Sequence, residues 1–345
     1  MSEEKISFEP VSFAVIPGWA GDDHTAAFAA LLKSCRKAKE PDGVCAAALE
    51  LGANTDRATA RAFFETHYVP HVVAGAEQAG FVTGYYEPEV MGARELGGKF
   101  TVPVYHRPDD LVTLKPDDER ARFNGEITGM RETTDGPKPY YTRAEIDGGA
   151  LSGRGLELLY LEDPVELYFM QVQGSGRVRL ADGSVVRLGF AAKNGHPYTS
   201  IGRRLVEMEE GRPEDLTMDG VKAWLRADPD RGRKLMHENE SYVFFHEIEG
   251  DGPIGAQGVA LTPERSLAVD TAYHRLGLPV FVSAPELTTP GGTQFHRLMV
   301  AQDVGSAIRG PERGDIFFGS GEAAGAIAGR TRHQAKFYVL LPKLG

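Results

Sequence analysis

The stretch that decides the fold is His296–Gly321, HRLMVAQDVGSAIRGPERGDIFFGSG, in which a glycine-rich segment separates two apolar runs. Asp303 ends the first run and Asp315 begins the second. Short apolar runs bounded by Gly, Pro and Asp are typical of β-strands. Similar runs continue on both sides of this stretch with little helix between them. Because a closed sheet exposes no edges, these strands favour a compact β-barrel.

The pattern of apolar residues changes once along the chain, at about residue 80. Residues 22–80 carry apolar positions at helical spacing, and Asp56 is suited to cap one of the helices. From Phe81 onward, short runs rich in Val, Tyr and Phe are broken by Gly, Pro and Asp. The sequence therefore predicts a mainly β fold with N-terminal helices.

Two central segments have distinct patterns. Residues 166–180, ELYFMQVQGSGRVRL, are interpreted as a strand that turns at residues 181–184 and returns as VVRLGFA. The charged, proline-bearing residues 211–235 follow, with a helix-like segment around Trp224. We interpret this second segment as a connector between domains.

Composition excludes some functions. With 345 residues, 41% of them hydrophobic, the chain is long enough for two domains. A net charge of -11 without a basic cluster argues against a nucleic-acid partner. The opening residues, MSEEKISFEP, have neither the basic nor the apolar part of an export signal, and no apolar run is long enough to span a bilayer.

The two cysteines, Cys35 and Cys45, leave two readings open. A local disulfide would stabilise the fold by about 2–3 kcal/mol in an oxidising compartment. Two buried thiols fit the composition equally well.

Three partial motifs carry little weight. Gly319, Ser320 and Gly321 resemble a dinucleotide fingerprint, but too little chain follows for the rest of that unit. His67 and His71 have a metal-ligand spacing interrupted by proline, which favours histidines near a helix end. The sequence has no G-x-S-x-G elbow for acyl transfer.

Carboxylates are the remaining candidates for chemistry. Asp270, Asp303 and Asp315 each lie at or beside an apolar strand. An acid among core strands is costly unless it is paired, hydrogen-bonded or exposed in a cleft, so such acids are often functional. We expect at least one of the three to be catalytic.

Six motifs with these residues resemble the membrane-bound lytic transglycosylase A (MltA) family. In chain order they are GYYEPEVMGAR, YLEDPVELYFMQVQGSGRVRLADG, GFAAKNGHPYTSIGR, NESYVFFHE, AVDTAYHRLGLPVFV and MVAQDVGSAIRGPERGDIFFGSGEAAG. The resemblance implies a double-psi β-barrel domain formed by both chain ends, residues 1–97 and 236–345. It also implies a smaller inserted β domain, residues 98–235, with a groove between the two.

By this resemblance Asp315 is the single catalytic acid and base, and Asp303 supports it. Such an enzyme cleaves the β-1,4 bond between N-acetylmuramic acid and N-acetylglucosamine and leaves 1,6-anhydromuramic ends. Asp315 must then be protonated near neutral pH, and we expect its apolar neighbours Ile316, Phe317 and Phe318 and an ionised Asp303 to raise its pKa.

Polar and aromatic residues of the other motifs are candidates for glycan contact. They are Tyr85, Tyr86, Glu87, Gln171, Gln173, Gly174, Ser175, His196, Tyr198, Thr199 and Asp270, whereas Tyr242 and Phe244 are expected in the core. The expected partners are peptidoglycan strands and complexes of wall synthesis or division, with no metal or organic cofactor. The implied location is the periplasm, with outer-membrane attachment in a precursor that carries the signal.

Two other functions remain open from the residues alone. A simple glycoside hydrolase would need a second carboxylate about 6.5–9.5 Å from the acid, and only Asp303 and Asp270 are near in sequence. A non-catalytic wall-binding barrel would tolerate loss of Asp315.

Overall fold

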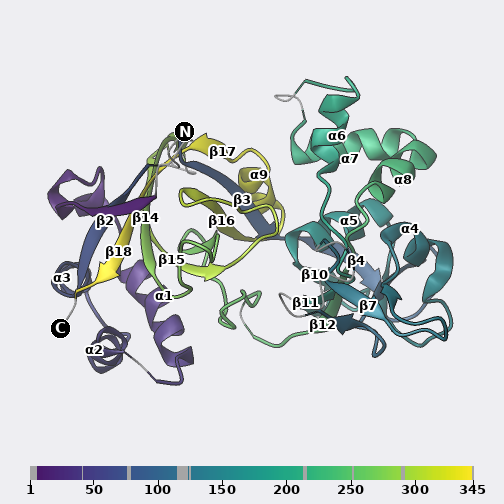
Figure 1. Cartoon of the computed structure of the whole chain (residues 1–345), viewed down its shortest axis with the longest axis horizontal. Coiled ribbons are helices and arrows are strands. Elements are labelled where there is room, and N and C mark those ends of the chain that lie inside the picture. Colours follow the sequence, from purple (N-terminus) through teal and green to yellow (C-terminus); the bar gives the residue numbers. More distant parts are fainter. Residues whose placement is uncertain are drawn as a thin grey trace. The chain divides into compact units, whose positions relative to one another are not determined.

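The computed structural model describes residues 6–40, 42–75, 79–114, 123, 126–212, 216–250, 252–288 and 292–343. The chain forms two compact units, one made of Met1–Tyr86 with Gly250–Gly345 and the other of Glu87–Glu249 (Figure 1). The first unit thus contains both ends of the chain. In the described residues, no helix has the length and apolar character needed to cross a membrane.

The first unit is built on a nine-stranded sheet with the order β1-β2-β18-β14-β15-β13-β16-β3-β17. Its strands are β1 (Ser7–Pro10), β2 (Tyr68–Ala74), β3 (Phe81–Glu87), β13 (Ser266–Val269), β14 (Pro279–Thr288), β15 (Gln294–Asp303), β16 (Arg313–Ser320), β17 (Arg332–Gln334) and β18 (Lys336–Pro342). Neighbouring strands in this order come from distant parts of the chain, for example β2 with β18 and β16 with β3. The prediction of a mainly β fold with N-terminal helices is confirmed.

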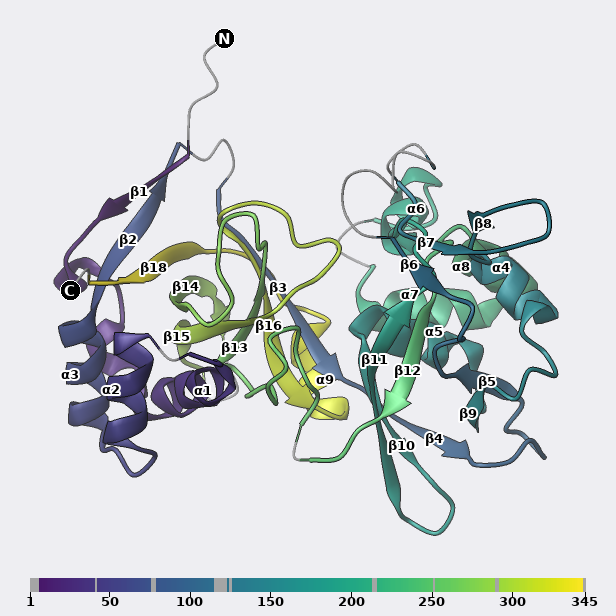
Figure 2. The ribbon, with the colours of Figure 1, turned by 60° about the horizontal axis from the view of Figure 1, so that its bottom comes forward.

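Three helices, α1 (His24–Lys37), α2 (Gly43–Leu51) and α3 (Arg57–His67), gather beside this sheet, as Figure 2 shows. Each begins at an aspartate whose side chain accepts backbone N–H groups, including the predicted cap Asp56. The helical region ends at His67, because β2 follows at once. The prediction that helices extend to residue 80 was therefore wrong, since the apolar run after Tyr68 pairs as a strand.

The helices share one apolar core with the sheet. Phe28, Leu31 and Phe64 of the helices are buried against Phe281 and Leu298 of the strands. A buried ion pair adds to this packing: Asp22, just before α1, accepts two hydrogen bonds from Arg265, at 2.8 and 2.9 Å. The N-terminal segment is thus held to the C-terminal strands by apolar and ionic contacts.

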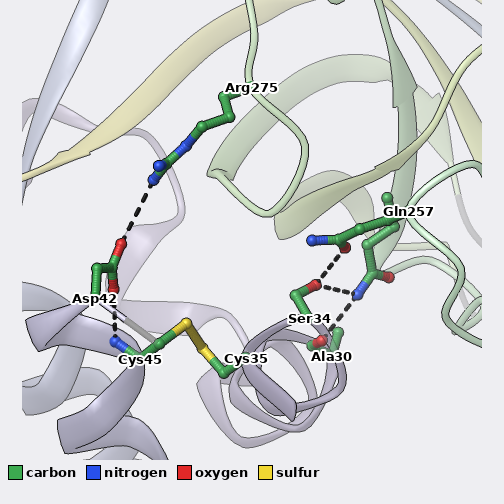
Figure 3. Close-up of a disulfide and its surroundings, with 8 residues drawn as sticks. Ala30, Ser34, Cys35, Asp42, Cys45, Gln257 and Arg275 are labelled. Atoms are coloured by element: carbon green, nitrogen blue, oxygen red, sulfur yellow. Dashed lines mark hydrogen bonds and ion pairs between the residues drawn. A yellow bond between two sulfur atoms is a disulfide. The ribbon is translucent and has the colours of Figure 1, made fainter. Parts of the chain in front are cut away.

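The sulfur atoms of Cys35 and Cys45 are bonded, which joins α1 to α2 (Figure 3). One residue before Cys35, the Ser34 hydroxyl donates to Gln257 at 2.7 Å and accepts from Gln302 at 2.8 Å. The disulfide therefore lies next to a polar network that connects α1 with the sheet.

The second unit contains two sheets. A six-stranded sheet has the order β12-β11-β10-β4-β9-β5, and a small one the order β6-β7-β8. The strands are β4 (Glu89–Ala93), β5 (Val102–Tyr105), β6 (Val112–Thr113), β7 (Gly129–Arg131), β8 (Lys138–Pro139), β9 (Glu157–Leu161), β10 (Ser175–Arg179), β11 (Val185–Lys193) and β12 (Val243–Glu247). The helices are α4 (Arg143–Glu145), a π-helical turn (Ile146–Ala150), α5 (Pro164–Gln173), α6 (Ile201–Glu207), α7 (Met218–Ala227) and α8 (Pro229–His237).

The predicted hairpin is half right. β10 and β11 pair antiparallel around the predicted turn, but residues 166–173 form the helix α5 and not a strand. Asp163 caps this helix, Pro164 begins it and Gly174 ends it with a φ of 78°. A short continuous apolar run does not distinguish a buried helix from a strand, and these end signals decide for the helix.

The predicted connector, residues 211–235, lies within the second unit. Its described part forms α7 and α8, whose Val221, Leu225 and Leu235 join an apolar cluster with α5 and α6. The amphipathic pattern around Trp224 therefore serves packing. The expected core residues Tyr242 and Phe244 are both buried, at 1% and 0% exposure.

The second unit is longer at both ends than the predicted insert, residues 98–235. It includes β4 and β12, because β4 pairs with β10 and β9 and β12 pairs with β11. Strand pairing at the two ends of the segment thus places the boundaries at residues 86/87 and 249/250.

Candidate active site

The strand order of the first unit brings two of the three acids together. Strand β13 has β15 on one side and β16 on the other, and its Ala268 lies opposite both Asp303 and Asp315. Two strand spacings separate the backbones of the two acids, or about 10 Å. The carboxyl groups of Asp303 and Asp315 therefore lie on either side of one small residue, Ala268.

Asp315 lies on β16 and has one strong hydrogen bond. The hydroxyl of Thr83 on β3 donates to its Oδ1 at 2.6 Å. Burial raises the pKa of Asp315 to about 6, the negative charge of Asp303 adds to this, and Thr83 and Arg313 act in the opposite direction. The upward direction of the shift is the one expected from the sequence, although a pKa of about 6 leaves Asp315 mostly ionised at pH 7.

The apolar surroundings of Asp315 differ from the expectation. Alternation along β16 puts Phe317 on the same face as Asp315, and Ile316 and Phe318 on the other face. Phe317 packs on Tyr85 with ring centroids 5.3 Å apart, in a cluster that includes Ala268. We expected Ile316, Phe317 and Phe318 to form the apolar surroundings of Asp315. Of these three only Phe317 lies on its face of the strand, and Tyr85 packs against that ring.

Asp303 is held at the end of β15 by three donors. Its Oδ1 accepts the backbone N–H groups of Ala256 and Val304, each at 2.9 Å. Its Oδ2 accepts the hydroxyl of Tyr85, also at 2.9 Å. Burial raises the pKa of Asp303, whereas these hydrogen bonds favour its ionised form.

The Tyr85–Asp303 hydrogen bond also shows that the sheet is curved. Strands β3 and β15 are third neighbours, which a flat sheet would hold about 14 Å apart. Strong curvature brings the two side chains together. Gly84 permits close packing behind the site, since a Cβ there would lie 2.6 Å from the ring of Phe318.

Asp270 is placed apart from this pair, in the turn after β13. Its Oδ1 accepts the N–H of Ala272 at 3.1 Å and its Oδ2 accepts the N–H of Gly310 at 2.9 Å. It is buried, at 5% exposure. These contacts are those of a residue that organises two loops.

Two of the remaining candidates lie near the boundary of the units. Tyr86 is buried and faces α9 (Glu322–Ala328), where a Cβ on Gly325 would meet its ring at 2.7 Å. Glu87 is fully buried and accepts a hydrogen bond from Arg187 at 2.8 Å. Both side chains are parts of the packing.

In the second unit, the candidates around α5 are mostly internal. Gln171 is buried, accepts a hydrogen bond from Arg143 and donates one to the carbonyl of Val243. Ser175 is buried at the start of β10, and Gln173 and Gly174 end α5 and are half-buried.

The GHPYTS segment contains both buried and exposed candidates. His196 is buried between the Tyr140 carbonyl at 2.7 Å and the Glu240 carboxylate at 3.2 Å. Thr199 donates its N–H to Asn239 at 3.0 Å. Tyr198 has 37% of its surface exposed, so of these it offers the most ring area to a ligand.

Sequence reasoning missed Thr83 and Arg313. Arg313 donates to the Thr83 hydroxyl at 2.8 Å and therefore belongs to the hydrogen-bonded group around Asp315. Two-residue alternation was the available signal, because Thr83 shares a strand face with Tyr85, and Arg313 with Asp315. Within the described residues, no three His, Cys, Asp or Glu side chains come together in a way that would hold a metal ion.

Comparison with known proteins agrees with this geometry. A family model described as the MltA specific insert domain matches residues 81–246, and a model described as the 3D domain matches residues 265–341. The membrane-bound lytic murein transglycosylase A of Escherichia coli K12 is 34% identical over 274 residues, which cover 77% of this chain and 67% of that protein. The chain belongs to the MltA family.

Relatives of solved structure support the MltA assignment. A membrane-bound lytic murein transglycosylase from Agrobacterium tumefaciens has 39% identity and a TM-score of 0.89 over 98% of both chains. MltA of Escherichia coli with bound chitohexaose has 27% identity and a TM-score of 0.72, over 99% of this chain and 97% of that one. The predicted family and fold, a 3D-type double-psi β-barrel with an MltA insert, are thereby confirmed. Like these relatives, the MltA protein described here is an enzyme.

Proposed function

We propose that this MltA protein is a peptidoglycan lytic transglycosylase in which Asp315 acts first as acid and then as base. The observation that carries the proposal is a half-buried carboxyl group with a pKa raised to about 6 and one oxygen held by Thr83. An acid with such a pKa has both protonation states populated between about pH 5 and pH 7, so the same group can give a proton and take one back.

The proposed reaction needs no water. Protonated Asp315 donates to the glycosidic oxygen as the bond from that oxygen to C1 of N-acetylmuramic acid breaks. The muramyl C6 hydroxyl then attacks C1, and its proton passes to the Asp315 carboxylate. A 1,6-anhydro ring forms and Asp315 regains its starting state. The 2-acetamido oxygen of the substrate stabilises the developing charge at C1, as in substrate-assisted glycosidases.

The environment of Asp303 supports a single-acid mechanism over an inverting hydrolase. A general base must accept a proton from water, but both oxygens of Asp303 already accept hydrogen bonds from Ala256, Val304 and Tyr85. These bonds weaken its basicity. We infer that Asp303 acts as a fixed negative charge that raises the pKa of Asp315.

Activity should depend on pH through the acid form of Asp315. With a pKa of about 6, roughly a tenth of the molecules hold the proton at pH 7. We expect kcat/KM on soluble glycan strands to be highest below pH 6 and to fall up to tenfold per unit above it.

The names of the relatives support peptidoglycan as the substrate class, and chitohexaose in the Escherichia coli structure supports binding of β-1,4-linked N-acetylhexosamines. We infer that the site of action is the cell envelope, where this polymer lies. Among the predicted glycan contacts, Tyr198 is favoured by its exposed ring, whereas the polar atoms of Gln171 and His196 have internal partners.

Mass spectrometry of digested murein sacculi tests the proposal. Products ending in 1,6-anhydromuramic acid are expected, and Asp315→Asn should yield none above background. Reducing muramic ends would indicate a hydrolase. Absence of any product from the wild-type protein would indicate a binding module.

A further inference from the structure

Arg313 lies two residues before Asp315 on β16, so both side chains leave the same face of the strand. Its guanidinium lies over the ring of Phe81, 5.5 Å from the centroid. Its Nη2 donates to the Thr83 hydroxyl at 2.8 Å, and its Nη1 donates to the carbonyl of Gly314. Arg313 is therefore fixed by an aromatic ring, a carbonyl and a hydroxyl.

The number of protons on each group decides which group donates and which accepts in the hydrogen bonds from Arg313 to Thr83 and from Thr83 to Asp315. A guanidinium has only donors, whereas a hydroxyl has one proton to donate. Because Thr83 accepts from Arg313, its own proton is free for Oδ1 of Asp315, 2.6 Å away. A threonine without Arg313 would be able to rotate and accept a proton from Asp315 instead.

We infer that Arg313 is a positioning residue for the proposed reaction: through Thr83 it fixes Oδ1 of Asp315 as an acceptor, so that Oδ2 is the oxygen that exchanges the proton. In the described part of the chain no hydrogen bond occupies Oδ2. This inference rests on the proposed function of Asp315 and adds which of its two oxygens does the chemistry.

The same contacts balance the charges around Asp315. Asp303 on β15 and burial favour its protonated form, and Arg313 and the Thr83 hydroxyl favour its ionised form. Tyr85 on β3 bonds to Asp303, and Asp270 at the end of β13 bonds to backbone amides. Helix α9, which also packs against β16, carries Glu322 in its first turn. Loss of either Arg313 or the Thr83 hydroxyl should therefore raise the pKa of Asp315 further.

Two variants and two matched controls test the inference. Arg313→Met removes the charge and the donor, and Thr83→Val removes the hydroxyl at nearly constant shape. Arg313→Lys keeps the charge, and Thr83→Ser keeps the hydroxyl. The measurements are the pH profile of kcat/KM on soluble peptidoglycan strands and a carbon-13 NMR titration of the Asp315 carboxyl, which needs no activity.

Arg313→Met and Thr83→Val are expected to move the alkaline limb and the carboxyl titration upward by about one pH unit, since a neighbouring arginine or a hydrogen bond shifts an acid by about that much. The rate on the acidic plateau should fall, because a higher pKa makes a weaker acid. Thr83→Ser should stay within a few tenths of a unit of wild type.

An unshifted titration in both Arg313→Met and Thr83→Val would overturn the inference. If Arg313→Met fails to fold, Thr83→Val decides it by the same titration, with Thr83→Ser as its control, and an unshifted Thr83→Val overturns the inference. The proposed function fails separately, namely if Asp315→Asn still releases anhydro ends.

Discussion

The two units each hold a charged side chain at least partly away from solvent, buried Arg143 in the second and half-buried Asp315 in the first, and the hydrogen bonding of the two differs. In the second unit, each of the three guanidinium nitrogens of Arg143 donates a hydrogen bond. Nε donates to the Asn239 carbonyl at 3.0 Å, Nη1 to the Gln171 amide oxygen at 2.6 Å and Nη2 to the Ser241 carbonyl at 2.6 Å. In the first unit, Asp315 has one oxygen bonded and the other without a described partner.

We propose that this difference separates a structural charge, Arg143, from a reactive one, Asp315. Arg143 also lies over the rings of Tyr168 and Tyr242, at 4.6 and 5.2 Å, so each of its nitrogens and the plane of its guanidinium have partners within the protein. A buried group whose hydrogen-bonding capacity is filled holds the fold together. A half-buried acid with an unused oxygen and a raised pKa is available for proton transfer.

The largest expected effect is on turnover by Asp315→Asn. Loss of both the acid and the base should lower the release of anhydro products by about 10²–10⁴-fold or more. The folded protein should survive, because an asparagine oxygen can still accept from Thr83. Comparable release by wild type and variant in a sacculus digestion assay would remove Asp315 from the mechanism.

The same variant should be more stable than wild type at neutral pH. Since the folded pKa of Asp315 lies near 6, above its ordinary value, its contribution to stability is present below about pH 4 and is lost as pH rises through 6. Asp315→Asn is expected to gain about 1–3 kcal/mol at pH 7 and little at pH 4. Denaturant unfolding at the two pH values checks the sign, and a variant less stable at pH 7 would contradict it.

Arg143→Met should show the opposite pattern, with a large loss of stability. Three buried oxygens would lose their donor, at about 1 kcal/mol or more each, so the unfolding transition of the second unit should lose at least about 3 kcal/mol. Arg203→Met is the matched control, since its side chain is 81% exposed and its unfolding should be nearly unchanged. Equal unfolding curves for Arg143→Met and Arg203→Met would contradict the structural role of Arg143.

Reduction of the disulfide should have an intermediate effect. The bond between Cys35 and Cys45 closes a short loop, and its loss is expected to cost about 2–3 kcal/mol. Thermal unfolding with and without reductant measures this. The Cys35→Ala, Cys45→Ala double variant should be equally destabilised and insensitive to reductant.

The smallest expected effect is that of Asp270→Asn. An asparagine retains one of the two acceptors that Asp270 offers to Ala272 and Gly310, so the loss of stability should be about 1–2 kcal/mol. Turnover should fall far less than in Asp315→Asn. A loss of turnover without a loss of stability would move Asp270 to the reactive class.

The sequence predicted those features that local pattern and motif determine. Asp303 ends β15 and Asp315 is the third residue of β16, both in distinctive motifs, and the family followed from these motifs. Local pattern did not reveal Ala268 between the two acids or Arg313 on Thr83, since both depend on strand order. It also misassigned α5, where a run of apolar residues fits helix and strand alike.

For the predicted glycan contacts the limit was different. Gln171, His196 and Glu87 belong to motifs of the family, but sequence does not tell an amide or imidazole that faces a ligand from one that holds a turn. In the structure their partners are Arg143, the Tyr140 carbonyl and Arg187. Burial and partners, which are three-dimensional properties, make that distinction.

The discontinuous first unit has a consequence for the timing of activity. Thr83 and Tyr85 are translated long before Asp303 and Asp315, and β2, which pairs with β1 on one side, pairs on its other side with β18, which ends at Pro342. A nascent chain that ends before β16 therefore contains Thr83 and Tyr85 but lacks Asp315. Since β18 lies between β2 and β14, the sheet that carries these acids is complete only when the last strand has been made.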